Sequence, residues 1–383
     1  MAIERKFFRP PAGHSFLFGL RGTGKSTWLH SALPNAVWVD FLSPAQQRLY
    51  AARPERLREL VAANPGSEDV VIDEVQRVPE LLTVVHQLIE LPNCPRFVLT
   101  GSSSRKLKRA GVDLLAGRAT LRLMHPFMAA ELGPRFSLDA ALEVGLLPIV
   151  WDARDPADTL SSYVGLYVQQ EVQTEGLVRN TGAFHRFLEA ISFAHGAILN
   201  VSEVARECAV SRKTVEGYVE IVEDLLLAFR VPVFTKRARR HMTAHPKFFF
   251  ADTGIFRSLR PAGPVDRPEE ARGAALEGLV AQHLRAWLAY SRSSANLYYW
   301  KTRAGSEVDF VVYGRDEFWA LEVKHSRRVR LADLRHLKRF RQDYPEARPR
   351  LAYRGAERLE IDGILCLPVE ELLHEIMPGQ PLP

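Results

Sequence analysis

A glycine-rich segment near the start of the chain, residues 19–26, reads GLRGTGKS and matches G-x-x-x-x-G-K-[S/T] at every fixed position. An apolar, strand-like run at residues 15–18 precedes it, and a helix-like run at residues 27–33 follows. In this order, backbone N–H groups wrap a phosphate and the helix N-terminus points toward it. The segment therefore predicts an open sheet that binds a nucleoside triphosphate at one strand end.

The fixed residues of this loop have distinct expected parts. Lys25 is expected to reach the β- and γ-phosphates, and the Ser26 hydroxyl is expected to ligate Mg²⁺. The remaining nucleotide contacts are predicted at Gly19, Gly22, Thr23, Gly24 and Thr27. ATP and Mg²⁺ are thus the predicted cofactors.

Further strand-like runs alternate with helical ones as far as about residue 123, which predicts an α/β domain with a parallel sheet. They lie at residues 36–40, 69–74, 96–102 and 119–123. The run at 69–74 reads DVVIDE and ends in two carboxylates. Asp73 is expected to hold the Mg²⁺ shell, and Glu74 is expected to polarise the attacking water.

Two further groups are candidates for the triphosphate site. Ser102, or Thr100, ends a buried strand, where a polar side chain can touch the γ-phosphate; the alternative is an ordinary strand-to-helix turn. Arg118 precedes the fifth strand, where an arginine finger would neutralise charge in a neighbouring subunit's site. Arg105, on a helix expected at about 104–110, is the second candidate finger, and a plain surface arginine is the alternative.

The middle of the chain, residues 199–220, has the pattern of a helix-turn-helix. One helix is expected at about 202–208 with Ser202 as its cap. The second carries apolar residues at helical spacing and begins with SRKT, where a recognition helix meets DNA. The basic stretch at 236–247 would be the wing. Because Glu216 and Glu220 would repel phosphate, a purely structural module is the alternative.

The C-terminal third contains the ordered set of residues that marks PD-(D/E)xK nucleases. A helix expected at about 269–290 carries Glu277, a strand at 307–313 carries Asp309, and a strand at 318–324 ends in Glu322-Val-Lys324. Period two puts the side chains of Glu322 and Lys324 on one face of that strand.

Three of these residues are candidate Mg²⁺ ligands. Glu277, Asp309 and Glu322 are expected to hold the metal, and Lys324 to position water or stabilise charge. Lys338, on a basic helix expected at about 331–341, is predicted to assist at the DNA backbone. A surface pair of Glu322 and Lys324, in a domain that keeps the fold for binding alone, is the alternative.

Charge and length bound the remaining possibilities. The chain has 383 residues and a formal net charge of +6, and residues 324–354 hold eleven Lys or Arg against three acids, which favours an anionic partner. No apolar run approaches the roughly 18 residues of a membrane span, and the N-terminus lacks a signal-peptide pattern, so we expect no membrane contact and a cytoplasmic location. The expected domains are an ATPase at 1–150, a helical winged-helix region at 151–262 and a nuclease-like α/β domain at 263–383.

Several of these segments together resemble a family of bacterial and archaeal single-chain ATPases. That family joins an N-terminal AAA-type P-loop domain to a C-terminal region containing a winged helix and a restriction-endonuclease-like domain. The marks are the segments 19–27, 70–76, 99–104, 115–118, 249–254, 299–303, 307–310 and 321–324. GLLP at 145–148 departs mildly from the family's usual Gly-Phe-Pro-like segment. The resemblance implies an ATPase that acts with DNA as a homo-oligomer, with a hexameric ring as the candidate form.

Two functions follow from this sequence. The first is an ATP-hydrolysing, DNA-binding protein that moves or remodels DNA, with branched DNA as one candidate substrate and a Mg²⁺-dependent nuclease site as a further activity. The second is a nucleotide-dependent switch or scaffold, whose nuclease-like domain only binds a nucleic acid or protein partner.

Overall fold

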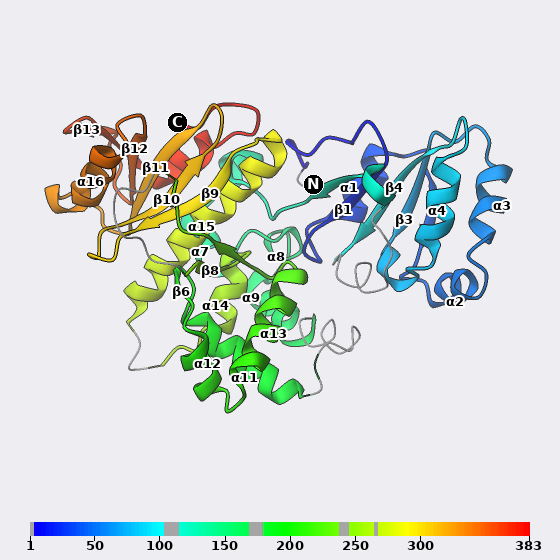
Figure 1. Cartoon of the computed structure of the whole chain (residues 1–383), viewed down its shortest axis with the longest axis horizontal. Helices are drawn as coiled ribbons and strands as arrows, with labels where there is room; N and C mark the ends of the chain where they lie inside the picture. The colour runs from blue at the N-terminus through cyan, green and yellow to red at the C-terminus, as the bar shows by residue number, and fades with distance from the viewer. Residues whose placement is uncertain (1–3, 103–114, 168–177, 179, 237–244, 264–266) are drawn as a thin grey trace. The chain divides into compact units, whose positions relative to one another are not determined.

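The computed structural model describes residues 4–102, 115–167, 178, 180–236, 245–263 and 267–383, and these fall into two compact units (Figure 1). The N-terminal unit comprises Glu4–His125 with Asp224–Leu226, and the C-terminal unit comprises Pro126–Glu223 with Leu227–Pro383. The predicted boundary at residue 150 therefore lies inside the C-terminal unit. The division into three domains stays a prediction.

The N-terminal unit is built on a five-stranded parallel sheet with the order β2-β3-β4-β1-β5. Its strands are β1 Ser15–Phe18, β2 Val37–Asp40, β3 Asp69–Asp73, β4 Arg96–Gly101 and β5 Thr120–Leu123. Strands β3 and β4 are buried along nearly their whole length, as in a parallel sheet covered on both faces. All five strands lie where the sequence predicted them.

The helices of this unit connect the strands. They are α1 Lys25–Ala32, α2 Pro44–Ala52, α3 Arg56–Ala63, η1 Val75–Arg77, α4 Leu81–Ile89 and η2 Leu115–Gly117. Helix α4 buries five residues of its apolar stripe, Leu81, Leu82, Val84, Val85 and Leu88. They join a core with strand residues such as Ile72 and Leu99. This packing fixes the carboxyl ends of β3 and β4, where the predicted site lies.

The C-terminal unit begins with a group of short helices. They are α6 Ala129–Leu132, η3 Gly133–Arg135, α7 Leu138–Val144, α8 Pro148–Trp151, α9 Pro156–Ser162 and η4 Tyr163–Tyr167, and α14 Thr253–Leu259 packs against α7. Asp252 caps α14, and its other carboxylate oxygen accepts a hydrogen bond from Leu146 N at 2.8 Å. Gly145 is required beside it, because a Cβ there would lie 1.9 Å from Asp252 Oδ1. The FFADTG and GLLP segments thus pack against each other.

A three-stranded antiparallel sheet follows, with the order β6-β8-β7. Its elements run along the chain as α11 Thr181–Ser192, β6 Ala197–Ile198, α12 Val201–Glu207, α13 Arg212–Asp224, β7 Ala228–Val231 and β8 Lys247–Phe250. The two helices of the expected helix-turn-helix are present. The predicted cap at Ser202 is wrong, because the Asn200 side chain accepts from Glu203 N and the helix starts at Val201.

The last part of the C-terminal unit is a six-stranded mixed sheet with the order β13-β14-β12-β11-β10-β9. Its strands are β9 Asn296–Lys301, β10 Glu307–Tyr313, β11 Phe318–Lys324, β12 Arg348–Tyr353, β13 Leu359–Ile361 and β14 Ile364–Pro368. Helix α15 Pro268–Ser291 contacts β8, β9 and β11, and α16 Arg335–Asp343 contacts β10, β11 and β12. The remaining helical elements are η5 Leu331–Leu334 and α17 Val369–Glu375.

The described helices include none with the length and apolar character needed to cross a bilayer. The cytoplasmic location stays a prediction.

Candidate functional site

The predicted phosphate loop closes on itself between β1 and α1. Lys25 Nζ donates to Gly19 O at 2.7 Å and to Leu20 O at 3.2 Å, and Thr23 Oγ1 donates to Leu20 O at 2.7 Å. Gly24, at the N-cap of α1, has φ +83°, a left-handed conformation that glycine adopts without strain. The lysine side chain is buried against the loop that would surround a phosphate.

A hydroxyl and a carboxylate meet at the start of α1, from segments 47 residues apart. Ser26 Oγ donates to Asp73 Oδ2 at 2.7 Å, and Thr100 Oγ1 donates to Asp73 Oδ1. Asp73 is only 3% exposed. These hard oxygen donors fit Mg²⁺, which takes few protein ligands and keeps several waters.

Glu74 follows Asp73 in a left-handed backbone conformation, with φ +57°, at the carboxyl end of β3. Its backbone N–H donates to Thr100 Oγ1 at 3.2 Å. Gln76 Nε2 donates to Glu74 Oε2 at 2.5 Å and to Ser102 Oγ at 3.2 Å. Ser102 thus contacts the glutamate's partner, and Thr100 contacts both Asp73 and Glu74.

Gln76 was not predicted as a site residue. Its signal was its position within VVIDEVQ, two residues after the glutamate. An amide is a common surface side chain, so the sequence alone does not separate it from a solvated one. The structure separates the two cases, because Gln76 is only 3% exposed and lies between the predicted site residues Glu74 and Ser102.

The remaining predicted residues of this unit lie around the loop or apart from it. Gly22 has a positive φ, and Thr27 is exposed on α1. Arg118 follows η2, is exposed, and pairs through Nε with Glu90 Oε1. Arg105 and the helix expected at 104–110 lie outside the described residues.

The C-terminal unit brings the four predicted nuclease-type residues into one region. Asp309 Oδ2 accepts a hydrogen bond from Val323 N at 2.9 Å, which joins β10 to the strand that carries the other pair. Lys324 Nζ donates to Glu322 Oε1 at 2.6 Å, so these side chains share a face as predicted. Glu322 Oε2 is buried and has no hydrogen-bond partner among the described residues.

A lysine that was assigned to the wing lies at the centre of these acids. Lys247 Nζ is 2.8 Å from Glu277 Oε1, 2.7 Å from Glu307 Oε1 and 3.4 Å from Asp309 Oδ1. The prediction that Lys247 contributes to a basic exposed wing is therefore wrong. It is 2% exposed, because it begins β8 and points into the six-stranded sheet's acids.

Burial and charge set the protonation of this cluster. Burial lowers the pKa of the Lys247 ammonium, but Glu277, Asp309 and Glu307 outweigh it and raise that pKa well above its ordinary value. Burial raises the pKa of Glu277 to about 7. Burial and the charge of Asp309 raise the pKa of Glu322 well above its ordinary range. Lys247 therefore carries the positive charge around which the acids are arranged.

As arranged, this acid cluster does not fit a divalent cation. The ammonium of Lys247 already lies against the oxygens of Glu277 and Asp309 that were predicted to ligate Mg²⁺. Among the described residues, no three or more His, Cys, Asp or Glu side chains are grouped so as to hold a metal ion. Lys338, predicted to assist at the DNA backbone, pairs with Asp362.

Glu307 and Lys301 complete the cluster and were also not predicted. Lys301 Nζ lies 2.6 Å from Glu307 Oε2, and Lys247 uses the other oxygen of the same carboxylate. Lys301 occurs in the YWKTR segment, and Glu307 begins the EVDF segment. Their pairing follows from the β9–β10 register, in which Glu307 lies opposite Lys301.

Basic side chains are exposed at two places in the C-terminal unit. At the start of α13, Arg212 and Lys213 are exposed, and Arg212 pairs with Glu216 at 3.0 Å. The loop that leaves β11 carries the exposed Arg327, Arg328 and Arg330. Both places offer positive charge to an anionic partner.

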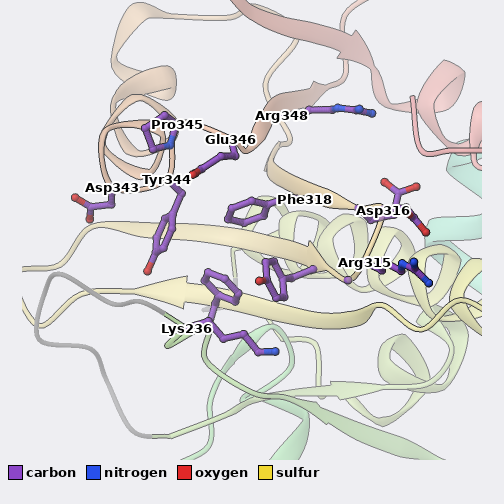
Figure 2. Close-up of a pocket in the computed structure, with 13 residues that line it drawn as sticks. Lys236, Arg315, Asp316, Phe318, Asp343, Tyr344, Pro345, Glu346 and Arg348 are labelled. Atoms are coloured by element: carbon purple, nitrogen blue, oxygen red, sulfur yellow. The ribbon is translucent and has the colours of Figure 1, made fainter.

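A pocket of about 370 Å³ lies at the turn that joins β10 to β11 (Figure 2). Phe318 and Tyr344 line it together with Lys236, whose Nζ lies 4.8 Å from the centre of the Tyr313 ring. Charged residues of both signs surround it, including Arg315, Asp316 and Glu346 (Figure 2). Among the residues that the structure describes, none of the predicted nucleotide-site or nuclease-type residues lines this pocket, and Lys236 comes from the predicted wing.

Comparison with known families divides the chain into three matched segments. Residues 13–133, which include all five strands of the parallel sheet, match a family described as an AAA domain. Residues 135–266 match a domain of unknown function, DUF8612, and residues 272–372 match another, DUF4143. The winged-helix and nuclease-like assignments stay predictions.

Two whole proteins are similar to nearly the full length of this chain. An uncharacterized protein of Mycobacterium tuberculosis and one of Mycobacterium bovis are each 26% identical over 381 residues, covering 97% of this chain and 83% of theirs. Among solved structures, the replication initiator DnaA bound to AMPPCP and single-stranded DNA has a TM-score of 0.29 at 13% identity. That match covers 55% of this chain and 82% of the DnaA chain in that structure.

Proposed function

We propose that this protein hydrolyses ATP and couples hydrolysis to work on DNA. The observation that carries the first part is the contact of Ser26 with Asp73 at 2.7 Å, beside Glu74 held by Gln76. This edge of the sheet brings together a phosphate loop, two oxygen donors for a metal ion and a carboxylate that can orient a water molecule. That is the set of groups that phosphoryl transfer to water requires.

Each residue has a proposed part in this reaction. Lys25 and the backbone of residues 19–24 bind the phosphates, and Ser26 and Asp73 hold Mg²⁺. When bound, Mg²⁺ supplies charge neutralisation on the phosphate oxygens. Glu74 orients the attacking water and accepts its proton. Thr100 of β4 holds Asp73 and the Glu74 backbone, and Ser102, which follows β4, contacts Gln76, the hydrogen-bond partner of Glu74.

Arg118 is the proposed finger, and its use requires a second subunit. In the single chain its guanidinium pairs with Glu90, and an exposed pair of this kind contributes only about 0–1 kcal/mol. It can therefore be exchanged for a phosphate at modest cost. We propose a homo-oligomer, with a hexameric ring as the candidate form.

DNA binding is proposed for the C-terminal unit. The element order α11-β6-α12-α13-β7-β8, with β8 between β6 and β7, supports a winged-helix module. The exposed Lys213 at the start of α13 and the exposed arginines after β11 favour an anionic partner. The net charge of +6 agrees with this partner.

An ATPase assay across a panel of DNA structures, four-way junctions included, tests this proposal. We expect DNA to raise the turnover of the wild type, and Lys25→Ala to abolish it. Lys213→Ala and Arg327→Ala should each weaken the stimulation by DNA. Each should also reduce the slope of log affinity for DNA against log salt concentration by about one, the value for one lost phosphate contact. Lys6→Ala, which removes an exposed lysine of the N-terminal unit, is the matched control. If no DNA raises the ATPase rate at low salt, the DNA part of the proposal fails.

A nucleotide-dependent switch or scaffold is the second candidate, and the position of Lys247 favours its binding-only C-terminal domain. In that case ATP changes assembly, hydrolysis is slow and DNA leaves the rate unchanged. Native mass spectrometry with and without ATP tests it. An unchanged oligomer in both states would count against a switch.

A further inference from the structure

Lys247 is a nearly fully buried cation whose ammonium contacts acids from two other elements. Glu277 comes from α15, and Glu307 and Asp309 come from β10, while Lys247 itself begins β8 of the small sheet. The three Nζ–O distances are 2.8, 2.7 and 3.4 Å. A buried charge is costly unless it is paired and hydrogen-bonded, and this one has three carboxylates.

The surroundings of Lys247 hold it in this position. Strand β8 pairs with β6 and β7, the Phe249 ring packs against Phe310 of β10, and Lys247 Nζ lies 5.6 Å from the centre of the Tyr299 ring. The backbone of the small sheet therefore fixes where the ammonium lies. It is not a long surface side chain that reached an acid by rotation.

The other two lysines of the cluster have different partners. Lys301 pairs with Glu307, and Lys324 pairs with Glu322. Both are about one-third exposed, whereas the Lys247 side chain is 3% exposed. The Lys247 ammonium thus lies against both Glu277 and Asp309. A divalent ion held by Glu277, Asp309 and Glu322 would need the same carboxylate oxygens.

We propose that Lys247 is the built-in cation of this acid cluster. Its ammonium takes the place of a divalent metal ion, so the nuclease-like site binds no divalent cation while β8 is docked. The same contacts hold the small sheet and its helices against the six-stranded sheet. This inference goes beyond the proposed ATPase function and depends on neither hydrolysis nor DNA.

The proposal has a direct electrostatic consequence. Lys247→Met keeps an unbranched side chain of similar length but removes the charge. Among the described residues, Glu277, Glu307, Asp309 and Glu322 would then face two lysines instead of three, at distances where one charge changes a cation's affinity strongly. The emptied position would recruit a divalent cation, and Glu322 Oε2, which has no hydrogen-bond partner among the described residues, is a further oxygen for it.

Titration of the full chain with Mn²⁺, read by the paramagnetic resonance signal of free Mn²⁺, tests this. All proteins carry Ser26→Ala and Asp73→Asn, which remove the metal site of the phosphate loop. We expect no Mn²⁺ binding that depends on Asp309 when Lys247 is present. Lys247→Met should gain Mn²⁺ affinity by about tenfold or more, and Asp309→Asn should remove that gain. Lys301→Met is the matched control, which should gain little because Lys247 remains.

Two results would overturn the proposal. One is Mn²⁺ binding with Lys247 present that Asp309→Asn abolishes, because the metal would then enter beside the lysine. The other is a folded Lys247→Met variant, with a native circular dichroism spectrum, that gains no Mn²⁺ binding. If Lys247→Met does not fold, the comparison of Lys247-containing protein with and without Asp309→Asn still decides the question.

Discussion

The side-chain amide of Gln76 donates to Glu74 Oε2 at 2.5 Å. The same nitrogen lies 3.2 Å from Ser102 Oγ, so the amide joins the end of β3 to the end of β4. The backbone of Glu74 is in the left-handed conformation, so its side chain leaves the chain in a different direction from that of an extended residue. Gln76 is therefore a positioning residue for the carboxylate that we propose orients the attacking water.

Replacing Glu74 by glutamine should separate binding from turnover. Glu74→Gln keeps the size of the side chain but cannot accept the proton of water. We expect kcat for ATP to fall about a hundredfold or more, the usual range for a lost general base, while nucleotide affinity changes little. Steady-state phosphate release and equilibrium binding of a fluorescent ATP analogue measure the two. Equal losses of binding and turnover would contradict the assigned role.

Gln76→Leu should lower kcat without raising KM. Leucine fills a similar volume but donates no hydrogen bond, so Glu74 loses its fixed position while the phosphate loop is untouched. We expect a loss of about tenfold in kcat, corresponding to about 1.4 kcal/mol. Gln87→Leu, on α4, is the matched control and should leave the rate unchanged. A rise in KM alone would show that Gln76 acts on nucleotide binding instead.

Much of this architecture follows from local patterns in the sequence. The strands of the parallel sheet are short apolar runs bounded by polar residues, and the phosphate loop is a continuous motif, so β1, β3 and β4 were located directly. Ser26 and Asp73 were each predicted to hold Mg²⁺, and the structure brings their side chains within 2.7 Å of each other. Local sequence patterns likewise located α15 and the strands β10 and β11.

The position of Lys247 could not be obtained in this way. In the sequence it belongs to a run with Lys236, Arg237, Arg239 and Arg240, and such a run reads as a solvated basic wing. Its burial depends on the docking of β8 beside α15 and β10, segments 30 and 62 residues away. Contacts of that kind leave no period or spacing in the sequence. The role of Arg118 could not be predicted for a similar reason, because a finger acts in the site of a second chain.

A finger role for Arg118 predicts complementation between two inactive variants. Arg118→Ala should lose most of its ATPase activity, since the charge that stabilises the transferred phosphate is absent from every site. Mixing it with Glu74→Gln should restore part of the activity, because some interfaces then combine an intact Glu74 with an intact Arg118. Arg53→Ala, which also breaks an exposed ion pair of the same unit, is the control. No recovery on mixing, with oligomers present, would leave Arg118 without a role in trans.

Asp252 should be a stability determinant of the C-terminal unit. Its Oδ1 accepts from Gly254 N at 2.9 Å and its Oδ2 accepts from Leu146 N at 2.8 Å, and the side chain is buried. In Asp252→Asn one of these N–H groups faces an amide NH₂ and loses its acceptor. We expect the free energy of unfolding to fall by about 2–3 kcal/mol. Asp155→Asn, at the exposed cap of α9, should cost less than about 1 kcal/mol in the same urea titration.

Two buried histidines should make the C-terminal unit lose stability in acid. Burial lowers the pKa of His195 to about 3 and that of His283 to about 4, from an ordinary value of 6.5. The unfolded chain therefore binds protons that the folded chain does not. The stabilisation is complete above pH 6.5 and is lost as the pH falls toward the folded pKa values.

Urea titrations across this pH range, with the wild type and His283→Gln, measure the effect. Glutamine can still accept from Ala129 N, which donates to His283 Nε2 at 2.9 Å, but it does not titrate. The variant should therefore lose less stability between pH 6.5 and about 4 than the wild type does, by up to about 1.4 kcal/mol per pH unit. His185→Gln, at an exposed position of α11, should keep the wild-type pH dependence. Parallel losses in the wild type and His283→Gln would mean that other groups cause the acid sensitivity.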